Sequence, residues 1–281
     1  MDAWLLSHEA PVRLGAFLAA FAAMAAWELV APRRALGQVK AMRWTNNLLL
    51  VALNTVTVRA ALPVAAIGAA AYAAQHGMGV LHILEVPYAW AFVLSVLALD
   101  LAIWLQHLMF HAVPLLWRLH RVHHADLDFD VTTGARFHPI EILLSVLIKL
   151  AVILALGPPA AAVLVFEVLL NATSMFNHGN VRMPVGLDRV LRWLVVTPDM
   201  HRVHHSVEPR ETNSNFGFNL PWWDRLFGTY RPQPAAGHDA MTIGVEQFRA
   251  SRELRLDRML LQPFREDAGA YPIGKREESA R

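Results

Sequence analysis

The sequence has no cysteine among its 281 residues. This absence excludes disulfides, thiolate nucleophiles, zinc fingers and iron–sulfur clusters. Charge is also scarce, because Asp, Glu, Lys and Arg make up only 17% of the chain and the formal net charge is +2. A chain without a basic excess is not expected to bind nucleic acid as its main partner. A glycine-rich phosphate loop and internal repeats are absent as well.

Apolar residues are abundant, at 55% of the chain, and the mean hydropathy is +0.33. Three apolar runs are each long enough to cross a bilayer: residues 14–31, 48–74 and 86–105. The second run contains Asn54, Arg59 and Pro63, which predict a kink or an amphipathic first half. A fourth apolar region, residues 142–176, is divided by Gly157-Pro158-Pro159 and therefore predicts a helical hairpin.

The short loops between these runs predict the orientation of the chain. Residues 32–45 contain four Lys and Arg side chains, whereas residues 1–11 and 75–87 contain none. By the positive-inside rule, the N-terminus lies outside and the later, histidine-rich segments are cytoplasmic. The charges that flank the first run differ from those of a cleavable signal peptide, so we expect an uncleaved anchor. The preference for arginine over lysine is typical of a GC-rich bacterial genome, so we expect the membrane to be a bacterial inner membrane.

Nine of the fourteen histidines fall into four clusters. They are His107 and His111; His120, His123 and His124; His178; and His201, His204 and His205. Spacings of three and four residues bring the imidazoles of one cluster to one face of a helix. One metal ion cannot use nine ligands, but two ions with four or five each can. An all-imidazole set suits iron, copper, nickel or zinc, and oxidation of a lipid C–H bond requires a redox metal.

Four further residues are candidates for supporting roles. Asp100 lies on the same helical stripe as His107, seven residues before it, and we expect it either to accept an N–H from a ligand histidine or to pair locally. Asn177 and Asn180 flank His178 and are candidates to support it. His138 precedes Pro139, which indicates a helix start rather than a ligand.

Several spaced motifs between residues 100 and 230 carry a family resemblance. They are DLAIWLQHLMFHAVPLLWRLHRVHH, RFHPIEILLS, NHGN, PDMHRVHHS and TNSNFGFNLPWWDRLFGTY. Together they resemble the fatty acid hydroxylase/sterol desaturase superfamily of membrane di-iron enzymes. The resemblance implies an all-α integral membrane bundle of about four transmembrane helices, hairpin included, under a cytosolic helical cap. It also implies that the nine histidines hold two iron ions, which use dioxygen and two electrons to hydroxylate or desaturate a lipid.

The sequence departs from the superfamily pattern at two positions. Leu108 replaces an arginine that commonly follows the first histidine, and Ser174 stands where some members have another histidine. The second departure leaves one metal short of a ligand unless Asn177, water or His138 completes its set. Because the chain has no fused cytochrome domain, the resemblance implies an external ferredoxin or reductase as electron donor.

Three regions follow from these observations. We expect N-terminal anchor helices in residues 1–99, a di-iron catalytic region with the hairpin in residues 100–237, and a polar C-terminal tail in residues 238–281. The leading hypothesis is a membrane-bound, oxygen-dependent hydroxylase of a lipid-like substrate. The alternatives are a desaturase with the same site, a non-enzymatic protein that transports or stores metal, and a structural protein with a vestigial site.

Overall fold

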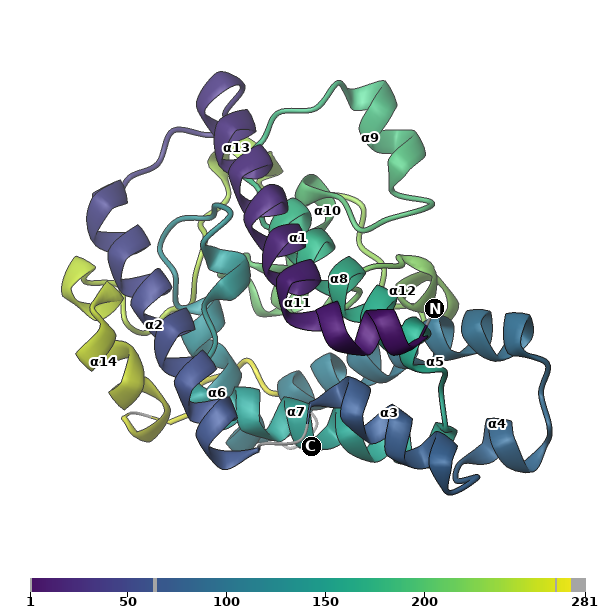
Figure 1. The fold of residues 1–281 in the computed structure, drawn as a ribbon. Helices are drawn as coiled ribbons and strands as arrows, with labels where there is room; N and C mark the ends of the chain where they lie inside the picture. Colours follow the sequence, from purple (N-terminus) through teal and green to yellow (C-terminus); the bar gives the residue numbers. More distant parts are fainter. Residues whose placement is uncertain (1, 63–64, 266, 274–281) are drawn as a thin grey trace, which may run out of the picture.

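The structure is a computed structural model and describes residues 2–62, 65–265 and 267–273. Within these residues the chain is helical, and the only extended pairs are two isolated bridges, Pro32 with Val181 and Ser206 with Ile243. The predicted all-α fold is therefore confirmed. Figure 1 shows α4, with the adjoining ends of α3 and α5, projecting from the rest of the bundle.

Five segments of the described chain are long and apolar enough to cross a membrane: Ser7–Val30, Lys40–Ile83, Tyr88–Ala112, Pro139–Leu156 and Ala160–Asn177. The corresponding helices are α1 (Asp2–Val30), α2 (Lys40–Ala61), α3 (Ala66–Gln75), α4 (Val80–Ile83), α5 (Tyr88–Ala112), α7 (Pro139–Leu156) and α8 (Ala160–Asn177). These segments support the predicted helical membrane bundle. The kink expected at Pro63 lies outside the described residues.

α7 and α8 are joined at the predicted Gly157-Pro158-Pro159 break, but the two arms of this hairpin touch little and both pack against α3 and α5. The His138 imidazole accepts a hydrogen bond from the Ile140 N–H (3.2 Å) and caps the start of α7, as expected from Pro139. At the other end Gly157 has a φ of +69°, and a Cβ there would collide with the carbonyl oxygen of Met78. Glycine meets both demands, because it has no side chain and adopts left-handed backbone angles without strain. The hairpin turn thereby packs against the turn that joins α3 to α4.

α8 is the central helix of the bundle. Half of its apolar window is buried, compared with 11% for α1 and for α7. Its apolar side packs against α3 and α5 in a core that includes Ile67, Leu99 and Phe166. On the side that faces α1 and α7, Glu167 forms ion pairs with Arg13 (3.2 Å) and with Lys149. Pairing of this kind is expected wherever charged side chains lie at membrane depth.

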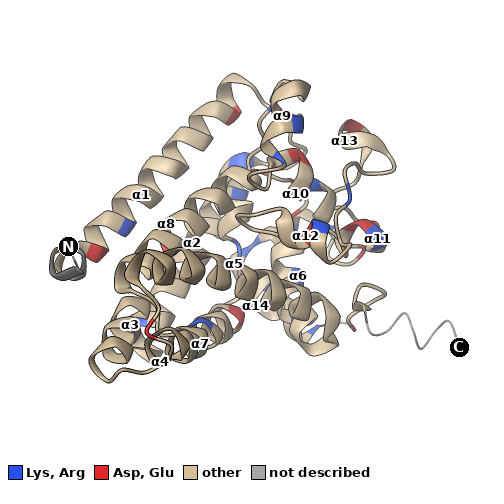
Figure 2. Ribbon diagram, turned by 90° about the vertical axis from the view of Figure 1, so that its right-hand side faces the viewer, with Lys and Arg blue, Asp and Glu red and all other residues tan. Residues whose placement is uncertain are grey.

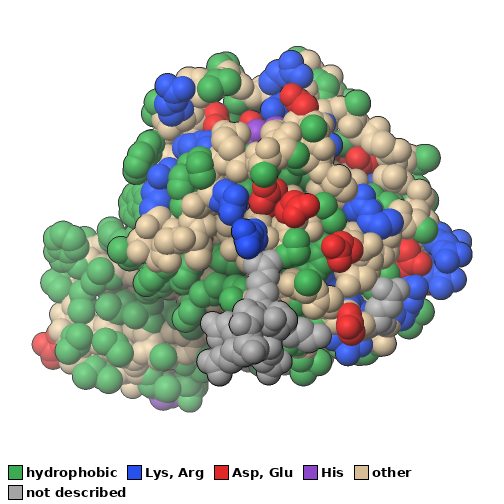
Figure 3. All heavy atoms as spheres, turned by 180° about the vertical axis from the view of Figure 1, so that it is seen from behind, with side chains coloured by type: hydrophobic (Ala, Val, Ile, Leu, Met, Phe, Trp, Pro, Cys, Tyr) green, Lys and Arg blue, Asp and Glu red, His purple; other side chains and the backbone are tan. Residues whose placement is uncertain are grey.

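Short helices and loops form a cap at one end of the bundle. They are α6 (Pro114–His124), η1 (Thr133–Ala135), α9 (Val185–Leu191), α10 (Pro198–His204), α11 (Pro209–Thr212), α12 (Trp222–Leu226), α13 (Gly237–Ala240), η2 (Ser251–Leu254), α14 (Leu256–Leu261) and η3 (Gln262–Phe264). Figure 2 shows charged residues gathered around α9 to α13. From behind, hydrophobic side chains cover the projecting lobe, whereas charged side chains are spread over the larger body (Figure 3). This division matches a membrane part and a water-facing part.

The C-terminal segment packs against this cap. The ring of Tyr271 stacks on Trp117 of α6, with ring centroids 5.1 Å apart. Arg121, also on α6, donates a hydrogen bond to the carbonyl oxygen of Gln262 (2.6 Å). The described part of the expected polar tail is therefore fixed to α6.

A buried ion cluster joins the membrane bundle to the cap. The guanidinium of Arg43, near the start of α2, donates to Asp126 (2.8 Å) and to Asp130 (2.6 Å). All three side chains are inaccessible to solvent. Burial alone would raise the pKa of Asp126, but the charge and hydrogen bonds of Arg43 outweigh burial and hold that pKa below its usual range. The pair therefore stays ionised and ties α2 to the loop that follows α6.

Candidate metal centre

The nine histidines of the four clusters converge at one place between the bundle and the cap. His107 and His111 lie on the last turns of α5, and His178 is the residue that ends α8. The other six come from α6 and from α10 with the residue that follows it. Each of the nine is buried, with an exposed fraction of 3% or less. Segments that are far apart in sequence thus form one closed cluster.

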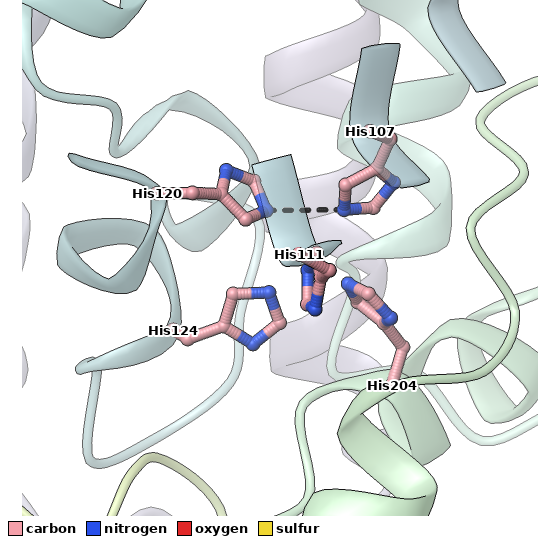
Figure 4. A group of neighbouring side chains, drawn as sticks. All are labelled: His107, His111, His120, His124 and His204. Carbon is pink, nitrogen blue, oxygen red and sulfur yellow. Dashed lines mark hydrogen bonds between the residues drawn. The ribbon is translucent and has the colours of Figure 1, made fainter. Parts of the chain in front are cut away.

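The cluster divides into two groups of possible metal ligands. The five-histidine group contains His107, His111, His120, His124 and His204, and the four-histidine group contains His123, His178, His201 and His205. Within each group, one nitrogen per residue lies within 4.8 Å of every other. Figure 4 shows the imidazoles of the five-histidine group pointing toward a common centre.

Each HxxHH motif contributes to both groups. In α6 the i, i+4 pair His120 and His124 belongs to the five-histidine group, and His123 belongs to the other. In the second motif this division is reversed, because His201 and His205 join the four-histidine group and His204 the five-histidine group. The sequence predicts that the three imidazoles of each motif share one face of a helix. They all face the cluster, but each motif supplies ligands to both groups.

The distances between imidazole nitrogens fit metal ligation. His107 Nε2 lies 3.0 Å from His120 Nε2, and His178 Nε2 lies 3.2 Å from His123 Nε2 and 3.1 Å from His201 Nε2. Two nitrogens bound at right angles to one ion, each about 2.1 Å from it, are about 3 Å apart. Nε2 atoms of His111, His124, His204 and His205 are buried and have no hydrogen-bond partner among the described residues. A metal ion bound at the cluster would satisfy these atoms.

In five of the nine rings the other nitrogen, Nδ1, lies within hydrogen-bond distance of an oxygen of the protein. Nδ1 of His107 donates to the Phe216 carbonyl (2.8 Å), that of His178 to the Ser174 carbonyl (2.7 Å) and that of His204 to the Ser214 carbonyl (2.7 Å). His111 Nδ1 lies 3.0 Å from Asn213 Oδ1, and His120 Nδ1 lies 2.6 Å from Glu141 Oε1. A proton held on Nδ1 leaves the Nε2 lone pair facing the cluster, as metal-binding histidines require.

The imidazoles outside the membrane spans are neutral. Burial lowers the pKa of His120 and of His178 to about 3. Burial, reinforced by repulsion from neighbouring imidazoles, also places the pKa of five others well below 6.5: His123, His124, His201, His204 and His205. A neutral ring keeps a lone pair available for a metal ion near pH 7.

Ser174 is engaged elsewhere. Its hydroxyl donates to the Gly134 carbonyl (3.0 Å), and its own carbonyl holds His178. Asn177 donates from its amide to the Phe218 carbonyl (3.0 Å), and Asn180 binds the backbone of Arg34 through both amide atoms. His138 caps α7 and belongs to neither group of possible ligands. Asn180 and His138 thus hold the chain around the cluster.

Asp100 does not contact a histidine through its hydrogen bonds. Its two oxygens accept from Asn219 Nδ2 and from Trp223 Nε1, both at 2.8 Å. Its partners come from the 219–223 segment, far away in sequence. The physical reason for the missing histidine contact is distance along α5, since Asp100 lies seven residues before His107, or about 10 Å along the helix. Asp100 instead anchors the 219–223 segment to the bundle.

Two carboxylates near the cluster were missed by the sequence interpretation. Glu141, in the FHPIE motif, lies within hydrogen-bond distance of His120 Nδ1. The only sequence signal for this role was the position of Glu141 in the first turn of a helix that starts beside a histidine. Asp224 accepts from the N–H groups of Phe216 and Gly217 (both 2.8 Å) and from Trp104 Nε1 (3.0 Å). It thereby fixes the backbone whose Phe216 carbonyl holds His107.

We expect Glu141→Gln to weaken metal binding while preserving the fold. The amide has the shape of the carboxyl group, but it replaces one acceptor oxygen by an NH2 group and accepts the His120 Nδ1 proton less strongly. Loss of such a partner lowers metal affinity by about 10- to 100-fold. Competition with a chelator measures this affinity, and the exposed Glu85→Gln serves as the matched control. Equal affinities in the Glu141 and Glu85 variants would contradict the assigned role.

The fold and the buried cluster define a multi-pass helical membrane protein with a nine-histidine centre. Residues 92–229 match the fatty acid hydroxylase family, which confirms the resemblance that the motifs carry. The match contains all nine histidines of the two groups.

Named relatives agree with the family. The chain is 31% identical over 191 residues to ornithine lipid hydroxylase OlsE of Rhizobium tropici, covering 68% of this chain and 55% of that protein. It is 29% identical over 158 residues to alkylglycerol monooxygenase of Xenopus tropicalis, covering 54% of this chain and 33% of that protein. The aligned part thus spans about half or less of these relatives. No solved structure gave a significant match.

Proposed function

We propose that this protein is a membrane-bound lipid hydroxylase whose nine histidines hold two iron ions. The observation that carries the proposal is the division of the buried imidazoles into a five-histidine group and a four-histidine group. Two adjacent sites of neutral nitrogen ligands, with the opposite ring nitrogen held by the protein in five cases, suit a pair of redox metals. When bound, such a pair would supply dioxygen activation.

The residues around the histidines would exclude water and hold the ligands in place. The ring of Phe137 stacks on His123, with centroids 4.4 Å apart, and Phe216 and Phe218 lie within 5.5 Å of His107, centroid to centroid. An aromatic lining of this kind would keep water away from a reactive centre. Hydroxylation then consumes one dioxygen, two electrons and two protons, and releases one water for each hydroxyl formed.

The position of the centre suits a lipid substrate. α5 begins at Tyr88 and reaches His107 about 28 Å further along the helix axis, close to the thickness of a bilayer's hydrocarbon core. An acyl chain within the bilayer could therefore approach the histidines along α5. The two relatives are named for an ornithine lipid and for alkylglycerol, which supports a polar lipid rather than a free sterol as the substrate class.

The orientation and the electron source complete the proposal. The positive-inside bias supports a cytoplasmic centre in a bacterial inner membrane, where a ferredoxin or reductase would deliver electrons. Hydroxylation is preferred to desaturation because both relatives carry hydroxylase or monooxygenase names. A metal transporter is less compatible, since transporters bind their cargo near the bilayer midplane and these histidines lie beyond the middle of α5.

Metal content and oxygen uptake test the proposal together. We expect two irons per purified chain, and oxygen uptake that requires reductant and rises when lipid is added. Mass spectrometry of lipids from cells with and without the protein should then show a product heavier by one oxygen. Tightly bound zinc without oxygen uptake would instead favour a metal-handling protein, and a product lighter by two hydrogens would favour a desaturase.

A further inference from the structure

A second region of the cap has features that the metal centre does not use. The turn that follows α9 lies against α12, because Trp222 Nε1 donates to the Trp193 carbonyl (2.7 Å) and Arg225 donates to the Arg192 carbonyl (3.0 Å). Large apolar side chains are exposed along both: Val185 (74%), Val190 (61%), Trp193 (58%), Leu194 (60%), Leu226 (70%) and Phe227 (54%). Clustered exposure of this kind marks a surface that meets another apolar phase.

This α9–α12 surface, formed by residues 185–194 and 222–227, lies beside a membrane-spanning helix. Phe227 stacks on Trp104 of α5 with ring centroids 4.8 Å apart, and Trp223 donates to Asp100 of α5. Asp100 and Trp104 are about 18 and 24 Å along α5 from Tyr88. A hydrocarbon core is about 30 Å thick. The surface therefore contacts the last third of the span, next to the point where α5 leaves the bilayer, and its apolar side chains would enter the interface.

Between the two helices is a cavity of about 390 Å³ lined by Asp188, Arg189, Arg192, Trp193, Arg225 and Tyr230. Arg192 pairs with Asp188, which also accepts from Thr197 Oγ1 (2.6 Å). Asp188 is therefore neutralised within the fold. Arg189 and Arg225 form no ion pair with any described residue, so the cavity has two uncompensated positive charges.

Arg225 is held in a fixed position. Its guanidinium lies between the rings of Trp193 and Tyr230, at 3.8 and 3.9 Å from their centroids. With both flat faces covered, only the edge of the guanidinium can donate hydrogen bonds. Arg192 is 6% exposed, and its Nε, like that of Arg225, is buried with no hydrogen-bond partner among the described residues. These donors suit an anion with several oxygens, such as a phosphate group.

We propose that the cavity between α9 and α12 binds the anionic headgroup of a membrane lipid while the exposed apolar side chains around it lie in the bilayer interface. The exposed apolar side chains around the cavity favour a lipid over a soluble anion, because only the acyl chains of a membrane would cover them. Arg189 and Arg225, which form no ion pair with any described residue, favour an anionic headgroup over a zwitterionic one. This binding requires neither metal nor turnover, so its failure would leave the proposed function untouched.

Lipid retention by the purified full-length protein tests this inference. The protein is equilibrated with mixed micelles of phosphatidylglycerol and phosphatidylcholine that have the same acyl chains, and bound lipids are counted by native mass spectrometry. We expect the wild-type chain to retain phosphatidylglycerol preferentially. Each arginine near a membrane surface contributes a factor of about five to anionic lipid binding, so R189Q/R225Q should lose about 25-fold in preference.

R252Q/R258Q is the matched control, because it removes the same charge from two arginines on η2 and α14. It should bind like wild type, and both variants should keep the wild-type metal content. If R189Q/R225Q does not fold, Arg189→Gln alone, at an exposed residue, should still lower the preference about five-fold.

Three results would overturn the inference. They are equal retention of the two lipids by wild type, wild-type preference in a folded R189Q/R225Q protein, and the same loss in the control. Millimolar inorganic phosphate should leave the bound lipid in place. A fourth result would also overturn the inference: if phosphate displaced the lipid completely, the cavity would be a site for free anions rather than for lipid.

Discussion

His204→Ala and His205→Ala should each remove one metal ion and abolish turnover, although the two residues are neighbours in sequence. His204 belongs to the five-histidine group and His205 to the four-histidine group. Under the proposed function, each variant therefore damages a different site, and iron should fall from two toward one per chain. Because both ions are needed to activate dioxygen, lipid-stimulated oxygen uptake should fall more than about 100-fold in either variant.

Comparing the two variants with their double variant tests whether the two histidines bind different ions, which a single variant does not. Elemental analysis gives the iron content, and the double variant should retain less iron than each single one. His76→Ala is the matched control, because His76 is an exposed histidine at the end of α3 and should keep wild-type iron and activity. Wild-type turnover in either neighbour variant would show that the α10 motif is not a ligand set.

Arg43→Leu should destabilise the protein by about 3–5 kcal/mol, since removal of one partner of a buried ion pair leaves uncompensated charge. The change would leave Asp126 and Asp130 without their guanidinium partner in a site that excludes solvent. Asp126 lies just after the first HxxHH motif, so the histidines of α6 should lose their fixed position as well. Thermal unfolding in detergent measures the loss of stability.

Arg59→Leu is the control for this prediction. Arg59 lies on the same helix, α2, but is exposed. Its replacement should change the midpoint of thermal unfolding little. Equal midpoints for the two variants would mean that the Arg43 cluster does not hold α2 to the cap. Arg43→Lys should fall between them, because lysine restores the charge but not the two-pronged contact with Asp126.

Much of the architecture follows from the sequence because its causes are local. The apolar runs and the Gly157-Pro158-Pro159 break predict the spans and the hairpin, and the structure has helices at those places. His138 before Pro139 predicts a helix start, and its side chain caps α7. Hydropathy, proline geometry and capping act over a few residues, so the order of residues is sufficient to predict them.

The partners of individual side chains could not be predicted in the same way. Asp100 shares a helical stripe with His107, yet it binds Asn219 and Trp223 from a loop more than 100 residues later. Glu141 was not a candidate, yet it lies 2.6 Å from His120. In both cases the partner comes from another helix or loop, and sequence spacing contains no information on how those elements pack.

The sequence by itself determined which side chains could form a metal centre, because nine imidazoles at helical spacings in a cysteine-free chain leave few other chemistries. Only the tertiary structure decided how they divide, with His204 in one group and His205 in the other. It also placed the arginines of α9 and α12 around one cavity. The reason is physical: helix periodicity is set along the chain, whereas a shared centre depends on the angles at which separate helices cross.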